Sequence, residues 1–138
     1  MTVFVDTSAW YAAVDSGDTS HLQATALLSR FAGQMVTGDH ILVETWYLTA
    51  SRLGYSAAEQ LVAGIRTGVA RIEATNLADL EVAAGIGEAF SDQTFSIVDR
   101  TSWAVMQRLG VHEAVSFDRD YSIYRFGPGR RQAFVVHC

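Results

Sequence analysis

The chain has 138 residues, a length typical of one domain with a buried core, and carries 15 acidic side chains against ten basic ones. All ten basic residues are arginines, which excludes mechanisms that need a lysine, such as the phosphate-binding P-loop, protein kinases and Schiff-base enzymes. No apolar run reaches the roughly 20 residues of a membrane helix, and the single cysteine, Cys138, excludes an intrachain disulfide. We therefore expect one domain over residues 1–138, without a membrane, in a reducing cytoplasm.

Charge is distributed unevenly along the chain. Residues 100–138 hold six arginines against three acids, whereas residues 1–99 hold four against twelve. A basic C-terminal part is typical of a surface that faces phosphates, and equally of a solvated arginine surface. The net charge of −5 therefore does not exclude a nucleic-acid ligand.

The first half of the chain predicts strands that alternate with helices. Residues 3–5 form a β-branched and aromatic run typical of a strand, and Asp6-Thr7-Ser8 supplies N-cap side chains for a helix directly after it. Apolar periodicity and capping residues predict the next elements in chain order: a helix over about 20–31, a strand over 35–37, a helix over 40–53 that ends at Gly54, and a helix to about residue 68 that Ser56 caps.

The second half continues the alternation. It predicts a strand over 70–73, helices over about 76–90 and 96–109, a strand over 114–117, a turn at Gly127-Pro128-Gly129 and a last strand over 133–136. Short apolar strands between helices are typical of a mainly parallel sheet with helices on both faces. The predicted fold class is therefore α/β.

Two acids directly follow predicted strands. Asp6 comes after the first strand and Asp118 after the fourth. Ligands of an open parallel sheet bind outside the carboxyl ends of the strands, where the strand order reverses. If these two strands are neighbours, the two carboxylates share one crevice. For Asp6 the alternative is a helix cap without a catalytic role.

Two further acids lie on apolar faces of predicted helices. Glu44 shares a face with Ile41 and Leu48. A carboxylate on such a stripe is costly unless it is paired or binds a metal, which favours a functional role. Asp99 shares a face with Trp103, although its place near a helix start equally permits a favourable dipole contact.

The segment Asp118-Arg119-Asp120 predicts a pair of acids that point the same way from an extended chain, although such loop acids are often merely solvated. Clustered carboxylates without a cysteine or histidine set indicate Mg²⁺ or Mn²⁺ rather than zinc. His40, four residues before Glu44, has no second histidine to complete a zinc motif, and we expect it on the surface. Arginines near these acids are candidates for phosphate contacts, with surface decoration as the alternative for each: Arg100, Arg119, Arg125, Arg130 and Arg131.

Four stretches in a fixed order carry a resemblance that spans nearly the whole chain: residues 3–11, Glu44, residues 95–102 and residues 114–121. Together they resemble the PIN-domain (PilT N-terminus) nucleases, and within them the VapC-type toxins of bacterial toxin-antitoxin pairs. The resemblance implies a three-layer α/β/α sandwich. It also implies an acidic site for Mg²⁺, with Mn²⁺ as a substitute, formed by Asp6, Glu44, Asp99 and Asp118.

The resemblance implies further that Thr7 or Ser8 supports a ligand or water, whereas the position of Asp120 varies in the family. Members cleave RNA, commonly tRNA or ribosomal RNA, and pair with a VapB-type antitoxin. We also expect a homodimer. Apolar residues that could form its face are Leu48, Leu61 and Ile65. Packing in the core explains these residues equally well.

The expected reaction is hydrolysis of an RNA phosphodiester by a water that one or two cations activate. Asp6, Asp99 and Asp118 would hold the metal, and Glu44 would hold a second ion or orient the water. A phosphoaspartyl enzyme is disfavoured, because Ser8 occupies the place of its second aspartate and a lysine is missing. The alternative from another class is a non-catalytic module whose acidic cleft docks a basic peptide.

Overall fold

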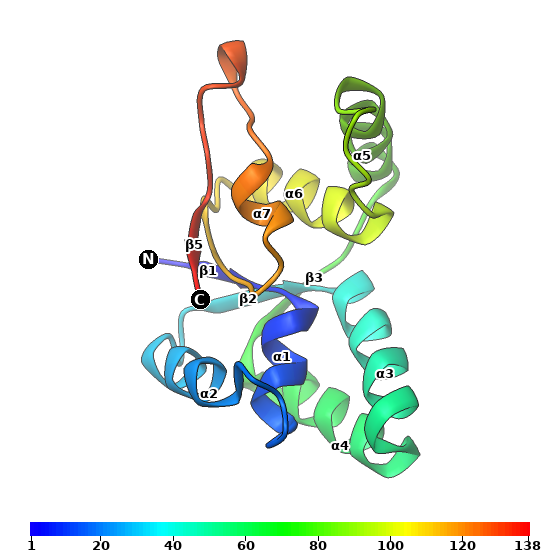
Figure 1. Cartoon of the computed structure of the whole chain (residues 1–138), viewed down its shortest axis with the longest axis vertical. Helices are drawn as coiled ribbons and strands as arrows, with labels where there is room; N and C mark the ends of the chain where they lie inside the picture. Colours follow the sequence, from blue (N-terminus) through cyan, green and yellow to red (C-terminus); the bar gives the residue numbers. More distant parts are fainter.

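A central parallel sheet separates two groups of helices in the computed structural model, which describes all 138 residues (Figure 1). Its strands are β1 (Val3–Val5), β2 (Met35–Gly38), β3 (Arg71–Glu73), β4 (Glu113–Val115) and β5 (Val135–His137). They lie in the order β3-β2-β1-β4-β5, and each of the four pairings is parallel. The predicted parallel sheet is confirmed, and the first and fourth strands are neighbours, which meets the condition under which Asp6 and Asp118 share one crevice.

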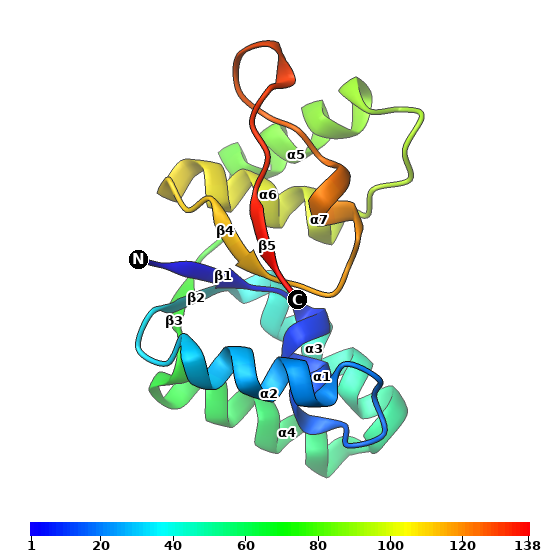
Figure 2. The same cartoon turned by 60° about the vertical axis from the view of Figure 1, so that its left-hand side comes forward.

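Helices cover both faces of this sheet. Those on one side are α1 (Thr7–Val14), α2 (His21–Arg30), α3 (Asp39–Leu53) and α4 (Tyr55–Gly64). Those on the other side are α5 (Leu77–Ala89), α6 (Ile97–Leu109) and the short α7 (Asp120–Ile123). Figures 1 and 2 show α1, α2 and α4 below the sheet and α5, α6 and α7 above it, which confirms the α/β/α sandwich. No helix has both the length and the apolar character needed to cross a membrane.

Two local predictions were wrong, and one element was missed. Ser56 does not cap the fourth helix, because Gly54, at a φ of 99°, ends α3 and begins α4 together. That helix stops at Gly64 and continues as a wide turn, η1 (Ile65–Val69), whose backbone leaves helical geometry at Thr67. Helix α7 was not predicted, since four residues are too few to show a helical period.

Capping side chains fix where the site-bearing helices begin. Ser96 caps α6, and its Oγ accepts a hydrogen bond from the Asp99 backbone N–H at 3.1 Å. Gly110, in the left-handed conformation, ends the same helix. Asp99 therefore lies in the first turn of α6, where the partial positive charge of the helix start favours a carboxylate.

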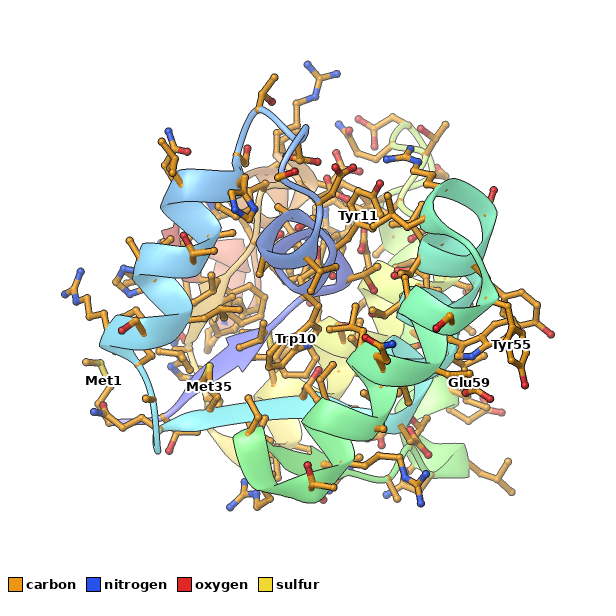
Figure 3. All side chains as sticks on the ribbon, turned by 90° about the horizontal axis from the view of Figure 1, so that it is seen from below. Met1, Trp10, Tyr11, Met35, Tyr55 and Glu59 are labelled. Carbon is orange, nitrogen blue, oxygen red and sulfur yellow. The ribbon has the colours of Figure 1, made fainter.

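Helix α1 is tied to the sheet by a buried polar contact. Figure 3 shows Trp10 between α1 and the sheet, and its indole N–H donates to Thr37 Oγ1 at 3.3 Å. Thr37 in turn donates to the Val5 carbonyl at 2.8 Å. Because Val5 precedes Asp6, these contacts hold the end of β1 and the start of α1 in a fixed relation.

An aromatic cluster fixes α6 against the segment after α7. Trp103 stacks on Tyr124 with ring centroids 4.5 Å apart and planes 6° apart, and Phe95 meets Trp103 edge-on at 4.8 Å. Trp103 is fully buried in the core. The cluster therefore holds Asp99, on α6, close to Asp118, which precedes α7.

Candidate active site

A cleft of about 370 Å³ lies at the carboxyl ends of β1 and β4. Ten residues line it, and only one of them, Leu48, is hydrophobic. Five are acids: Asp6, Glu44, Asp99, Asp118 and Asp120. The sheet order explains the convergence, because β1 and β4 are direct neighbours and deliver Asp6 and Asp118 to the same edge. The structure thus brings all four predicted acids together and adds Asp120.

Asp6 is held by four hydrogen bonds. Its Oδ2 accepts from Ser8 Oγ at 2.8 Å, from Ser116 Oγ at 3.0 Å and, more weakly, from the Ser8 backbone N–H at 3.4 Å. Its Oδ1 accepts from Tyr121 Oη at 3.1 Å. Burial raises the pKa of Asp6, and these donors oppose the rise. Asp6 also caps α1, so the predicted cap contact is present together with its place in the cleft.

Asp99 is the most strongly perturbed acid of the cleft. Burial, followed by the charges of Asp6 and Asp118 and a hydrogen bond with Asp118, raises the pKa of Asp99 to about 9. The carboxyl group is therefore protonated at neutral pH when no cation is bound. The predicted alternative, a dipole contact at the helix start, coexists with this place in the cleft.

Glu44 lies at the rim of the cleft and is half-buried. Burial raises its pKa, the nearby Thr7 hydroxyl opposes this, and the charges of Asp6 and Asp118 add to the rise. The predicted apolar stripe holds only in part: Ile41 is fully buried, whereas Glu44 turns toward the cleft.

Asp118 and Asp120 converge by a different backbone from the one predicted. The Asp120 N–H donates to Asp118 Oδ1 at 2.9 Å, so the chain turns at once into α7 instead of staying extended. Asp99, Asp118 and Asp120 can each place a carboxylate oxygen within 4.8 Å of the others. Burial and the Asp118 charge raise the pKa of Asp120.

The donor set fits a hard divalent cation. It consists of carboxylate oxygens, the ligands that Mg²⁺ and Mn²⁺ prefer, and includes no cysteine or histidine. The pKa values of Asp6, Glu44 and Asp99 are raised, which indicates that no positively charged group of the protein compensates their negative charges. A bound cation would supply that charge.

The prediction that His40 lies on the surface was wrong. Its side chain is only 16% exposed, and its Nε2 lies 2.8 Å from Ser102 Oγ. It does not join the carboxylate group. Sequence reasoning also missed Ser116 and Tyr121, the donors to Asp6. Ser116 could have been found from its place at a strand end, two residues before Asp118. Tyr121 could not, because it lies in α7, a helix that the sequence pattern does not predict.

Three of the predicted phosphate-binding arginines have structural roles. Arg100 donates to the carbonyls of Phe95 and Ala83 at 3.1 and 2.8 Å. Arg125 binds the carbonyls at the end of α7, and Arg130 lies over a phenylalanine ring. Arg119 and Arg131 form no hydrogen bond or ion pair through their side chains, and Arg119 lines a smaller hollow beside Asp118. Those two stay candidates for phosphate contacts.

Comparisons with known proteins agree with this geometry. The family model described as the PIN domain matches residues 3–127. The 23S rRNA-specific endonuclease VapC20 of Mycobacterium tuberculosis is 38% identical over 125 residues, which cover 90% of this chain and 95% of that protein. Ribonuclease VapC26 of the same species is 25% identical over 130 residues, which cover 93% and 96%.

Solved structures show the same fold. The crystal structure of M. tuberculosis VapC20, described as a sarcin-ricin loop cleaving toxin, matches with a TM-score of 0.84 and 34% identity over 88% of this chain and 94% of that one. VapBC2 of Rickettsia felis, bound to promoter DNA, matches in fold alone, with a TM-score of 0.70 and 9% identity over 99% and 97% of the two chains. Because the family model and a relative of 38% identity each span most of the sequence, the chain belongs to the PIN domain family.

Proposed function

We propose that the chain is a single-domain, metal-dependent endoribonuclease that hydrolyses RNA phosphodiester bonds and serves as the toxin of a toxin-antitoxin pair in the cytoplasm. The observation that carries the proposal is the cleft with five carboxylates at the β1–β4 edge, where the pKa of Asp99 is raised to about 9. The family and the endonuclease relatives support the same activity. No observation favours a non-catalytic module that docks a basic peptide.

The cation in this proposal is Mg²⁺, with Mn²⁺ as a substitute. Asp6, Asp99 and Asp118 would hold it directly or through water, and Asp120 is close enough to Asp99 and Asp118 to share it. When bound, it lowers the pKa of a water ligand and offsets charge on the phosphoryl oxygens. The four hydrogen bonds to Asp6 would hold that carboxylate in one orientation.

Glu44 would act as the general base that accepts a proton from the attacking water. It lies on α3, lines the cleft and is half-buried, with a raised pKa. A general base works best when its pKa lies near the operating pH, so this shift suits a carboxylate that accepts a proton from the attacking water. Glu44 is also placed to hold a second cation if the site takes two.

Ribosomal RNA is the substrate class that we propose, with tRNA as the competitor. The support is the 38% identity to a 23S rRNA-specific endonuclease over most of both chains. The cleft is open and polar, as a flexible single-stranded loop requires. Arg119 adjoins Asp118 and would contact the substrate backbone beside the acids.

A VapB-type antitoxin and a second copy of the chain are the proposed protein partners. An apolar groove between α3 and α4 exposes Val43 and Tyr47, whose exposed fractions are 59% and 68%, and would receive the antitoxin. Figure 3 shows Tyr55 at the outer edge of the same helix pair. The earlier candidates for a dimer face fit poorly, because Ile65 belongs to the core and Leu48 lines the cleft.

The first prediction concerns cleavage of ribosomal RNA. The partner-free chain should cut it at discrete sites with Mg²⁺ or Mn²⁺ and leave it intact with EDTA. Asp99→Asn should lower the cleavage rate on the order of 10³-fold, because it removes a charge from the centre of the site. Asp92→Asn, at an exposed position outside the cleft, is the matched control and should cut like the wild type. Gel analysis of RNA ends measures both.

Intact RNA in the presence of a folded, Mn²⁺-binding chain would contradict the proposal and favour the binding module. Cleavage that persists in EDTA would contradict the proposed metal dependence. Cleavage of tRNA alone would keep the nuclease and overturn the substrate class.

The second prediction concerns stability against pH without metal. Carboxyl groups with raised folded-state pKa values bind protons more tightly in the folded chain than in the unfolded one. For Asp99 the stabilising effect is complete below about pH 4 and is lost as the pH rises toward its folded-state pKa of about 9, by about 1.4 kcal/mol per pH unit. In EDTA, urea unfolding should therefore give a falling free energy of unfolding from pH 5 to 9, with a shallower fall for Asp99→Asn than for Asp92→Asn. Equal slopes in the two variants would show that Asp99 titrates normally.

The third prediction concerns assembly. Helix α5 exposes Leu77 and Leu80, with exposed fractions of 81% and 42%, on one face at a spacing of three residues. We expect this face to form the dimer contact. Light scattering of the purified chain should give the mass of two copies, and Leu77→Glu should give the mass of one. A single-copy mass for the unaltered chain would contradict the proposed dimer.

A further inference from the structure

A second hollow adjoins the cleft along the same edge of the sheet, and we call it the side hollow. It has a volume of about 260 Å³ and lies where β4 and β5 end, whereas the cleft lies where β1 and β4 end. Asp118 lines both. Figure 2 shows the end of β5 beside the loop that leads from β4 to α7. A group bound in the side hollow would therefore lie directly next to a group bound at the acids.

The inner wall of the side hollow is apolar and held in place. Phe117 and Val136 line it, and both also pack against the hydrophobic core. The Phe117 backbone N–H donates to Ser8 Oγ at 2.9 Å, and that hydroxyl donates to Asp6 Oδ2 at 2.8 Å. The loop after β4 is thus tied to the acids, which fixes the Phe117 ring relative to them.

Three side chains around the side hollow carry hydrogen-bonding groups that have no partner in the protein. Arg119 forms no side-chain hydrogen bond or ion pair, and the Ser122 hydroxyl forms none although the carbonyl of this residue accepts from an arginine. The Ser20 hydroxyl is also free, even though Ser20 stands at the start of α2, where a serine usually caps the helix. These groups come from three different elements and meet only at this hollow.

An apolar wall with polar groups at its edge matches a nucleobase. A base has an apolar face, which stacks on an aromatic ring, and an edge of donors and acceptors. A phosphate group fits the interior less well, because the inner wall is apolar and Asp118 adds a negative charge at one side. The volume of about 260 Å³ lies just below the roughly 300 Å³ of the smallest pockets for drug-sized ligands, which suits one base rather than a longer segment.

We propose that the side hollow is a nucleobase subsite, which holds the base of a nucleotide next to the scissile phosphate of the RNA. Phe117 contacts the face of this base, the hydroxyls of Ser20 and Ser122 bind its edge, and Arg119 contacts the backbone of the same nucleotide. The inference rests on the proposed function, because only a nuclease has a scissile phosphate beside Asp118. It adds the part of the protein that selects the sequence at the cut.

The side hollow can be filled without a change to the acids. Ser122→Phe, at an exposed position of α7, places a ring in the space of the base. The matched control is Ser29→Phe, at an exposed serine of α2 that lines neither the cleft nor the side hollow. The substrate is a short synthetic RNA that spans a cleavage site mapped on ribosomal RNA. It is used intact and with an abasic nucleotide at each position next to the cut.

The wild type should lose about tenfold in kcat/KM when the base is removed at one of these positions, as expected for the loss of a stacked base. Ser122→Phe should cut the intact RNA about tenfold less efficiently and should not respond to the same abasic nucleotide, because the contact is already lost. Ser29→Phe should behave like the wild type. Additive losses in Ser122→Phe, or equal responses of the wild type to every abasic position, would overturn the proposal.

Binding without catalysis tests the subsite independently of cleavage. In EDTA, nitrogen-15 NMR follows the backbone amides of Phe117, Arg119 and Ser122 while the nucleoside monophosphates of the standard RNA bases are added one at a time. At least one of them should shift these signals in the wild type and in Ser29→Phe, and none should do so in Ser122→Phe. Ribose 5-phosphate should leave the signals in place. Equal shifts with ribose 5-phosphate would show a phosphate site and overturn the base.

The two measurements separate the subsite from the proposed function. Metal-dependent cleavage without amide shifts and without dependence on a neighbouring base would refute the subsite and leave the nuclease intact. Base-dependent shifts that Ser122→Phe abolishes, in a chain that cuts no RNA, would support a hollow that binds a base and refute the proposed function.

Discussion

Repulsion between carboxylates that the fold does not allow to separate is the constraint on which the site depends. The β1–β4 pairing brings Asp6 and Asp118 to one edge, and the start of α6 adds Asp99 from above the sheet. In water such groups would move apart or stay solvated. Here burial and mutual charge raise the pKa of Asp99 to about 9. The site without a cation therefore holds protons that a cation would displace.

The contacts around the cleft keep the carboxylates from moving apart. Asp6 accepts from Ser8, Ser116 and Tyr121, and the stack of Trp103 on Tyr124 fixes α6 against the segment that follows α7. A carboxylate held by several donors loses little freedom when it binds a metal, which favours affinity. The same rigidity prevents the acids from turning outward when the metal is removed.

Much of the fold and the four acids could be predicted from the sequence, because each left a local signal. Asp6 directly follows β1, Asp118 comes three residues after the end of β4 at Val115, and Asp99 interrupts an apolar helical face. Their meeting depends on strand order, which sequence could state only as a condition. The resemblance to PIN nucleases supplied Glu44 as a member of the same group.

The features that could not be predicted arise from contacts between distant segments. The backbone of Asp120 follows from a turn that the Asp118 side chain forms, and Arg100 donates to the carbonyls of Ala83 on α5 and of Phe95. His40 has the sequence context of an exposed first-turn residue. Its inward position depends on the space above Gly38 and on Ser102, which lies 62 residues away. Periodicity carries no information about such contacts, since it describes one element at a time.

The most direct test of the account is the number of protons released when Mn²⁺ binds. Calorimetric titration at pH 7.5 in buffers of different ionisation enthalpy measures this number. The raised pKa values predict release of at least about one proton by the wild type and clearly less by Asp99→Asn, because a group with a pKa of about 9 is protonated before the metal binds. Binding without proton release in the wild type would show that the carboxylates are already ionised, and would contradict the account.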